Sequence, residues 1–201
     1  MSGGSTLLVT SFVTRAMTAT PGSRSLVPLQ ILARPLMARC GGSTRPATSW
    51  DRTQWVQVPG ALTRISAGSE TNVWGVNSAG NIFRYTGDDS NPWVRIPGAL
   101  TDIGAGADGT VWGVNSADDI FRYSWDRTQW VHVPGKLVAI SAGVKTNVWG
   151  VNSGGNIFTY TGDDGNPWVR IAGGLSDIGA GADGEVWGVN SAGNIYRYIR
   201  D

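Results

Sequence analysis

Two short motifs combine a tryptophan with a carboxylate and a guanidinium, and they lie 75 residues apart. They are Trp50-Asp51-Arg52 and Trp125-Asp126-Arg127. A sugar presents an apolar ring face and a rim of hydroxyl groups, so a Trp can stack on the face while Asp and Arg bond the hydroxyls. Both motifs fall in segments that we predict to be connecting loops, where recognition residues often occur. We therefore predict carbohydrate contact at both motifs; the alternative is a Trp packed on the edge of a sheet.

A second pair of loops carries acidic and amide side chains with the same separation. One loop contains Asp88, Asp89 and Asn91, and the other contains Asp163, Asp164 and Asn166. Their oxygens can accept hydrogen bonds from sugar hydroxyls, so these six residues join the candidate carbohydrate contacts. Paired carboxylates are also Ca²⁺ ligands, which leaves a calcium site open as an alternative, although the loops lack the EF-hand spacing. We predict no cofactor.

The residue types that catalysis needs are scarce. His132 is the only histidine, and Gln57 stands at the matching position 75 residues earlier, so the pattern contains no recurrent His general base. Cys40 is the only cysteine, which excludes an internal disulfide, and no nucleophile motif surrounds it. The Asp pairs could act as acid and base, but their Gly-containing loops favour a turn in solvent. We expect no enzymatic activity.

The 201-residue chain is nearly neutral, but its charges are unevenly distributed. Residues 1–48 hold five arginines and no acidic residue, within a total of 16 Lys plus Arg and 15 Asp plus Glu. An acid-free segment rich in Arg, Ser and Thr is typical of mitochondrial transit peptides; a disordered leader or an expression remnant is the simpler interpretation. A net charge of +1 gives no reason to expect a nucleic-acid partner. No apolar run reaches the ~20 residues of a membrane-spanning helix.

Internal repeats organise the rest of the chain. The string WGVN begins at Trp74, Trp112, Trp149 and Trp187. A second landmark of the form Trp-Val-x-(Val/Ile) begins at Trp55, Trp93, Trp130 and Trp168. Residues 49–123 also align without gaps to residues 124–198, and only 16 of these 75 positions differ. The array is therefore two near-copies of an alternating pair of units.

Each unit is predicted to form four short strands. In the first unit these are Trp55–Val58, Leu62–Ser66, Val73–Val76 and Asn81–Tyr85. Pro59-Gly60 ends the first strand, Ala67-Gly68 ends the second, and Asn77-Ser78-Ala79-Gly80 forms a hairpin turn. Short strands, Gly-rich turns and no helical periodicity are typical of a β-propeller blade. We predict an all-β propeller over residues 49–201, with blades at 49–85, 86–123, 124–160 and 161–198, after an irregular basic leader at 1–48.

Most repeated residues are expected to have structural roles. The Trp of WGVN should pack between sheets. The Gly that follows it (Gly75, Gly113, Gly150 and Gly188) should allow close approach of neighbouring strands, and the Asn of the same motif (Asn77, Asn115, Asn152 and Asn190) should hold the turn. Arg84, Arg122 and Arg197, with Arg95 and Arg170, are expected to bridge neighbouring blades; projection toward a ligand is the alternative.

The motifs of residues 49–198 resemble the tectonin family of propeller lectins, to which related plasma and egg lectins belong. The resemblance rests on the opening W-x-x-(V/I)-P-G-x-L, the A-G break, VWGVN and the closing G-N-I-(F/Y)-R-Y. Known members usually have about six units, whereas this chain has four. Secreted members often contain disulfides, which a single cysteine cannot form internally. The resemblance implies a propeller fold and carbohydrate binding, and it favours an extracellular location; with no clean signal peptide, a cytoplasmic one stays open.

We therefore predict a multivalent lectin that recognises glycans on cell or microbial surfaces and agglutinates them. Several weak sites on one rigid frame raise avidity by about 10²–10⁴. The alternative is a protein–protein interaction scaffold built on a propeller. With four units, the chain either closes into a ring or leaves strand edges exposed, and exposed edges promote self-association.

Overall fold

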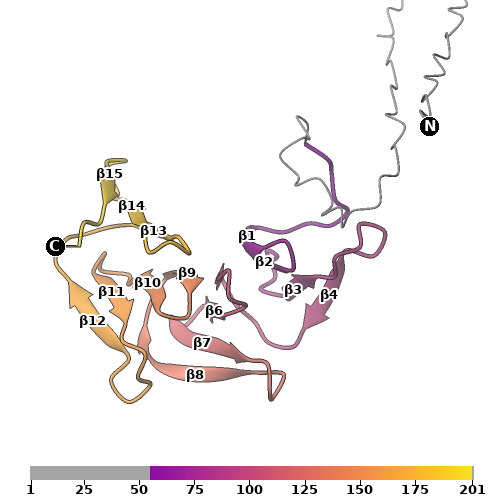
Figure 1. The fold of residues 1–201 in the computed structure, drawn as a ribbon, viewed down its shortest axis with the longest axis horizontal. Helices are drawn as coiled ribbons and strands as arrows, with labels where there is room; N and C mark the ends of the chain where they lie inside the picture. Colours follow the sequence, from indigo (N-terminus) through magenta and orange to yellow (C-terminus); the bar gives the residue numbers. More distant parts are fainter. Residues whose placement is uncertain (1–54, 201) are drawn as a thin grey trace, which may run out of the picture. The chain divides into compact units, whose positions relative to one another are not determined.

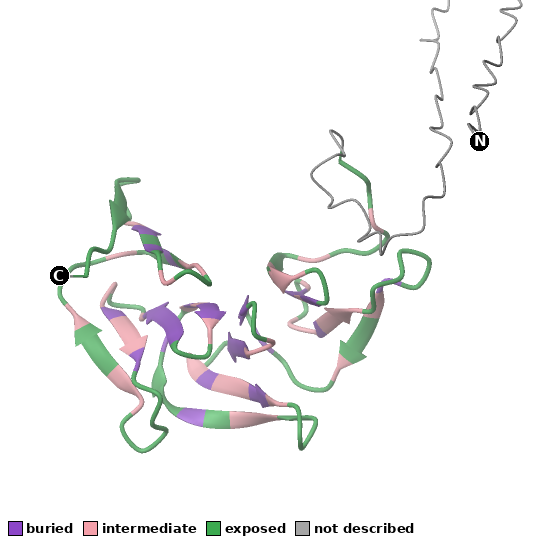
Figure 2. Ribbon diagram, viewed as in Figure 1, coloured by how far each residue is buried: buried purple, intermediate pink, exposed green. Residues whose placement is uncertain are grey.

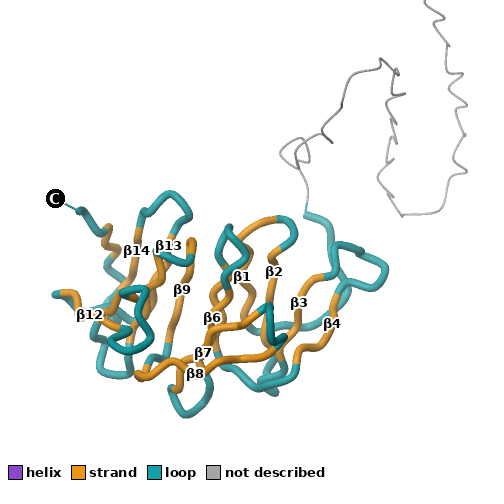
Figure 3. Tube along the Cα trace, turned by 60° about the horizontal axis from the view of Figure 1, so that its bottom comes forward, coloured by secondary structure: helices purple, strands orange, loops and turns teal. Residues whose placement is uncertain are grey.

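The computed structural model describes residues 55–200, and all of the regular structure in that range is antiparallel β-sheet (Figures 1 and 3). Sheet 1 contains β1 (Arg64–Ser69), β2 (Asn72–Val76), β3 (Ile82–Tyr85) and β4 (Trp93–Ile96). Sheet 2 contains β5 (Asp102–Ala105), β6 (Val111–Val114), β7 (Asp119–Ser124) and β8 (Gln129–Lys136). Sheet 3 contains β9 (Ala139–Val144), β10 (Asn147–Val151), β11 (Ile157–Tyr160) and β12 (Trp168–Ile171). Sheet 4 contains β13 (Asp177–Ala180), β14 (Val186–Val189) and β15 (Ile195–Arg197).

The predicted all-β architecture with four propeller blades is confirmed. Within each sheet the strands follow chain order, and the first strands pack in sequence: β1 against β5, β5 against β9 and β9 against β13. Buried residues concentrate on the inner strands, and the outermost strands β4 and β12 are mostly exposed or half-buried (Figure 2). The predicted leader at residues 1–48 lies outside the described residues, as do Trp50, Asp51 and Arg52.

The sheets are offset by one strand from the sequence repeats. Each of sheets 1 to 3 takes its outermost strand from the Trp-Val-x-(Val/Ile) segment that opens the following repeat, as β4 shows at Trp93. Sheet 4 has three strands in the described residues, and Trp55–Val58 pairs with none of them. The prediction of a strand at Trp55–Val58 was therefore wrong for this structure, because a strand needs a neighbouring edge to supply its hydrogen bonds.

The inner hairpins are close to their predicted form. In the turn after β2, the Asn77 side chain accepts hydrogen bonds from the amides of Ala79 and Asn81, and Gly80 adopts a φ of 77°. The same Asn bonds recur at Asn115, Asn152 and Asn190, which confirms the predicted turn role. The predicted break at Ala67-Gly68 is replaced by a register shift between Ala67 and Ser69, so β1 continues to Ser69.

The glycine of each WGVN motif makes room for a side chain. A Cβ added at Gly75 would lie 2.4 Å from Leu62 Cδ1 and 2.9 Å from the Arg64 carbonyl oxygen. Leu100, Leu137 and Leu175 take the same place over Gly113, Gly150 and Gly188. The expected close approach therefore exists, and the leucine that precedes the first strand of each sheet fills it.

The tryptophans of WGVN form the main contacts between sheets. Trp74 of sheet 1 lies 5.1 Å from Tyr123 and 6.1 Å from Trp130 in sheet 2, measured between ring centroids. Trp112 of sheet 2 repeats this contact with Tyr160 and Trp168 in sheet 3. Trp74, Trp112 and Trp149 are almost completely buried, as predicted. Trp187 of sheet 4 is 49% exposed, so the prediction is wrong for that copy, which has no following sheet in the described structure.

One of these tryptophans has an unsatisfied indole. Trp74 and Trp149 each donate their Nε1–H at 2.8 Å to the Asn two residues earlier, whereas Trp112 Nε1 is buried with no partner in the described structure. Thr110 stands where the other two sheets have Asn. We predict that Thr110→Asn supplies the missing acceptor and raises the free energy of unfolding by about 1 kcal/mol. Urea denaturation measures the change; Thr110→Val is the control, and equal stability of the two variants would contradict the prediction.

Candidate functional site

The predicted site residues lie in equivalent loops of different sheets. Residues 86–92, 125–128 and 161–167 each join the third strand of a sheet to the fourth. Because neighbouring strands are antiparallel, these loops emerge at the same end of a sheet as the turn between its first two strands. The structure therefore places the described candidate residues at one end of the sheets, and it separates them along the series of blades.

Trp125 is a partly exposed aromatic residue between sheets 1 and 2. It keeps 44% of its surface exposed, and its Nε1–H donates to the Gly109 carbonyl at 2.8 Å. Its ring meets Trp74 and Tyr123 edge-on at centroid distances of 5.8 and 5.1 Å. Trp125 thus packs on a blade, which was the alternative interpretation, and it still presents a surface to solvent, so its contact with a sugar stays a prediction.

Trp125 lines a polar cleft of about 480 Å³ that both sheets contribute to. The other lining residues are Ser69, Thr71, Asn72, Arg84, Ala107, Asp108 and Gly109. The Arg84 guanidinium carbon lies 5.6 Å from the centroid of the Trp125 ring, which is a cation–π distance. Hydroxyl groups, a guanidinium and a carboxylate thus line the same cleft as the aromatic ring, and this combination can bond a polyhydroxylated ligand.

The other two residues of this motif, Asp126 and Arg127, are exposed in the β7–β8 loop and are not part of the cleft lining. Of the predicted triplet Trp125-Asp126-Arg127, only Trp125 therefore lies among the cleft residues. Contact of Asp126 and Arg127 with a sugar stays a prediction.

The acidic loops bond largely to themselves. Asp88 Oδ1 accepts from the Ser90 amide at 2.9 Å and from the Ser90 hydroxyl at 2.7 Å, and these bonds lower the pKa of Asp88. Asp163 Oδ1 accepts from the Gly165 amide at 2.8 Å. The amides of Asn91 and Asn166 donate to the carbonyls of Asp88 and Asp163 and close the same turns.

The second Asp of each pair bonds a tyrosine. Asp89 accepts from the Tyr85 hydroxyl, and Asp164 accepts from the Tyr160 hydroxyl. Burial, and next this bond, raise the pKa of Tyr160. Arg122 of sheet 2 also donates to Asp164 at 2.8 Å, so this arginine bridges two blades as predicted. Asp89 and Asp164 thus have structural bonds of their own, and sugar contact there stays a prediction.

Sequence reasoning did not include the cleft residues Ser69, Thr71 and Asp108. Arg84 was expected to bridge neighbouring blades, and it does reach from sheet 1 to Trp125 of sheet 2. A usable signal was present in the 75-residue repeat, because Ser69 and Arg84 are matched by Val144 and Thr159. Past the aligned region, position 200 matches position 125 and carries Arg in place of Trp. Arg200 donates to Asn147 Oδ1 at 3.0 Å, so sheets 3 and 4 have no copy of the Trp125 cleft in the described structure. Three of the eight lining residues thus differ from their counterparts in the repeat, and the other five are shared.

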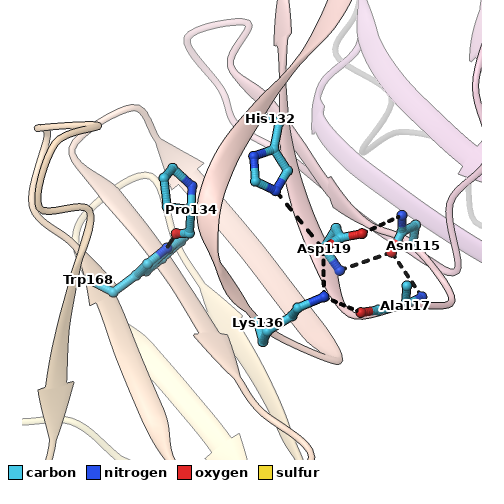
Figure 4. Close-up of polar contacts among 7 residues, drawn as sticks. All are labelled: Asn115, Ala117, Asp119, His132, Pro134, Lys136 and Trp168. Carbon is cyan, nitrogen blue, oxygen red and sulfur yellow. Dashed lines mark hydrogen bonds and ion pairs between the residues drawn. The ribbon is translucent and has the colours of Figure 1, made fainter.

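A separate polar cluster lies at the opposite end of sheet 2 (Figure 4). Lys136 Nζ donates to Asp119 Oδ1 at 2.6 Å and to the Ala117 carbonyl at 2.7 Å, and His132 Nε2 lies 4.0 Å from the same carboxylate oxygen. The bond from Lys136 is the main cause that lowers the pKa of Asp119. In sheets 1 and 3 the matching contact is an Arg–Asn bond within one sheet, from Arg95 to Asn81 and from Arg170 to Asn156. These two arginines therefore do not bridge blades as expected.

Comparison with protein families gives a match to the Tectonin domain at residues 43–167 and 85–201. No curated protein matches the chain. Within residues 55–200 the structure contains no group of three or more His, Cys, Asp or Glu side chains that could hold a metal ion. None of the described residues forms a helix long and apolar enough to cross a membrane.

Solved structures with a similar fold are diverse propellers of low identity. The chain is similar to the structure of U3-55K (10% identity, TM-score 0.51, 71% of this chain and 54% of that chain). It is also similar to a streptogramin B lyase structure (15% identity, TM-score 0.50, 73% of this chain and 57% of that chain). Each match thus spans about half of the other protein, and at these identities the likeness shows the fold alone.

Proposed function

The chain belongs to the tectonin family, and from this membership and the geometry of the Trp125 cleft we propose that it is a multivalent carbohydrate-binding protein that recognises glycans on cell or microbial surfaces. The single observation that supports the proposal best is the cleft itself. An aromatic ring with 44% of its surface exposed stands beside the Arg84 guanidinium and the hydroxyls of Ser69 and Thr71.

The polar groups of the cleft are suited to hydroxyl recognition. Asp108 is held in place by the amides of Thr110 and Lys145, at 3.1 and 2.8 Å. A carboxylate oxygen can accept more than one hydrogen bond, so a fixed Asp108 retains capacity for a sugar hydroxyl. Each such bond replaces one to water and contributes about 1 kcal/mol net, so affinity at one cleft should be weak.

Multivalency requires a second site, and Trp50 is its predicted centre. Trp50 stands 75 residues before Trp125 in the same Trp-Asp-Arg sequence. Two sites on one frame would convert weak contacts into useful avidity at a glycan-coated surface. Within a single chain, agglutination then depends on both tryptophans, and loss of either one should abolish it.

We predict that Trp125→Ala weakens the affinity for a glycan ligand about tenfold, which corresponds to about 1.4 kcal/mol, because the apolar face for stacking is lost. The ligand would first be identified on an array of mammalian and bacterial glycans, and its affinity then measured by calorimetry. Val169→Ser, on the exposed face of β12, is the matched control and should bind like the parent.

Two outcomes would overturn the proposal. One is failure of the protein to bind any glycan on the array. The other is full affinity in the Trp125→Ala variant together with full agglutination. A protein partner whose capture survives glycosidase treatment would instead favour the scaffold function.

A further inference from the structure

We propose that two copies of this chain associate head to tail, with Trp55–Val58 of one copy completing sheet 4 of the other. The proposal is independent of sugar binding. It rests on two surfaces of the same chain that are exposed in the structure and that repeat the main contact residues of an interface already present between sheets 2 and 3.

The two surfaces lie at the two ends of the series of sheets (Figure 1). Trp187 and Ile195 on sheet 4 are 49% and 71% exposed, whereas the matching Trp112 and Ile120 on sheet 2 are 1% and 0% exposed. Ile65 on sheet 1 is 64% exposed, whereas the matching Ile140 on sheet 3 is 4% exposed. Side chains that the repeat buries elsewhere are therefore in solvent at both ends, which is typical of an interaction surface.

The interface between sheets 2 and 3 shows how such surfaces fit. Asp102 Oδ2 accepts from the Ile140 amide at 2.9 Å, and burial is the main cause that raises the pKa of Asp102. The Ala107 amide donates to the Gly143 carbonyl at 2.7 Å. A Cβ on Gly104 would lie 2.9 Å from the Ala142 amide nitrogen, so the two strands meet backbone to backbone.

Both halves of this interface recur on the exposed surfaces. The sheet 2 side is repeated on sheet 4 by Asp177, Gly179, Ala182, Trp187 and Arg197. The sheet 3 side is repeated on sheet 1 by Ile65, Ala67, Gly68, Tyr85, Asp89 and Trp93. Arg197 already lies over Trp187 at 5.7 Å, as Arg122 lies over Trp112 at 5.5 Å. Sheet 4 of one copy can therefore pack on sheet 1 of another in the manner of sheets 2 and 3.

The outer edge of sheet 4 has room for one particular strand. In sheet 2, β8 pairs with β7 so that Trp130 faces Tyr123 and Val133 faces Ile120. The same register pairs Trp55 of a second copy with Tyr198, and Val58 with Ile195. Trp55–Val58 has the sequence Trp-Val-Gln-Val, which differs from the matching segment of β8 only at His132.

A pocket receives the tryptophan of that strand. In sheet 1, the Trp130 ring packs against Ile82 and against Gly98, where an added Cβ would lie 3.1 Å from the ring. Trp168 fills the matching place in sheet 2 and donates to the Pro134 carbonyl at 2.9 Å (Figure 4). Between sheets 3 and 4, the matching residues Ile157 of β11 and Gly173, which follows β12, line a pocket of about 350 Å³. No described residue fills this pocket, and Trp55 is 102% exposed.

Head-to-tail contacts form a closed ring when the rotation between subunits closes, and an open filament when it does not. Two copies bring together eight sheets, at the upper end of the range of about four to eight in known propellers. Because each copy has one donor segment and one acceptor sheet, a two-copy ring satisfies both ends of both chains. Within one chain Trp55 is fully exposed and does not line the pocket, so we assign the pocket to Trp55 of a second copy, in a closed dimer.

The test measures the mass of the full 201-residue chain by sedimentation over a range of concentrations. We expect about twice the chain mass of 21.3 kDa. Gly179→Val should raise the dissociation constant about 100-fold or more, because the new side chain meets the second copy's backbone at both interfaces. Within one chain nothing lies within 4 Å of that Cβ, so circular dichroism should be unchanged. Trp55→Ala should have the same effect on mass, and Val169→Ser should have none.

Mixing the two variants tests the direction of association. Gly179→Val retains its donor segment and Trp55→Ala retains its acceptor sheet, so an equal mixture should form a two-chain species that neither variant forms alone. A single-chain mass at all concentrations would overturn the proposal, as would a dimer that persists in both variants. A mass that rises without limit would overturn the closed ring.

Discussion

Gly143→Ala is expected to lower the free energy of unfolding by about 3 kcal/mol, at the upper end of the usual cost of overpacking. A Cβ at Gly143 would lie 1.9 Å from the Gly181 carbonyl oxygen and 2.3 Å from its carbon. Both are backbone atoms, so no side-chain rotation can relieve the clash, and sheets 3 and 4 must move apart. Because total stability is typically about 5–15 kcal/mol, the variant should unfold at a clearly lower urea concentration.

Another glycine in a first strand supplies a control for this experiment. Gly179 also lies in the first strand of a sheet, but a Cβ there meets nothing within 4 Å. Gly179→Ala should therefore be neutral or stabilise the single chain by about 0.5 kcal/mol, because alanine restricts the unfolded chain more than glycine does. The comparison requires a protein concentration at which both variants are single chains. Equal losses in the two variants would show that sheets 3 and 4 do not approach as closely as described.

Trp112→Ala is expected to lower the free energy of unfolding by about 3–5 kcal/mol, the range for large aromatic residues removed from a core. Trp112 is 1% exposed and contacts both Tyr160 and Trp168, so its removal leaves a cavity between sheets 2 and 3. Urea denaturation monitored by circular dichroism measures the loss without depending on tryptophan fluorescence.

Trp187→Ala is the control for the same motif at a different position. Trp187 is 49% exposed in the single chain, so its removal should cost about 1 kcal/mol, less than at Trp112. At higher concentration, where we propose a dimer, this variant should lose stability through weaker association. A cost at Trp187 in dilute solution equal to that at Trp112 would contradict the single-chain exposure described here.

Local features were predictable from the amino-acid sequence because short-range chemistry determines them. Asn77 and its three counterparts hold their turns through bonds to amides two and four residues ahead. Such bonds depend on residues that are adjacent in the chain, so a repeated Asn at a turn is informative without further context. The same is true of the Gly that follows each Trp of WGVN, although the leucine that it accommodates became evident only in the structure.

The cleft could be predicted only in part, because it is assembled from two sheets. Trp125 was identified from its position outside the repeat landmarks, but Arg84 reaches it from another blade. Nothing in the sequence between these two residues specifies how one sheet lies against the next. The carboxylates of Asp88 and Asp163 show the opposite case, since neighbours in their own loops already bond them.

The repeats and their residue types were sufficient to predict an all-β propeller, its hairpin turns and the tryptophans between its sheets, because alternation and turn chemistry act within a few residues. Only the tertiary structure decided whether each copy of a motif is buried and whether it pairs with another strand. Trp112 and Trp187 share the sequence VWGVNSA, yet one is buried and the other is half exposed. Trp-Val-x-(Val/Ile) is a strand at Trp93, Trp130 and Trp168 and is unpaired at Trp55. The physical reason is that burial and strand pairing both depend on a neighbouring strand or sheet. In the described structure, that neighbour is present for some copies of a motif and absent for others.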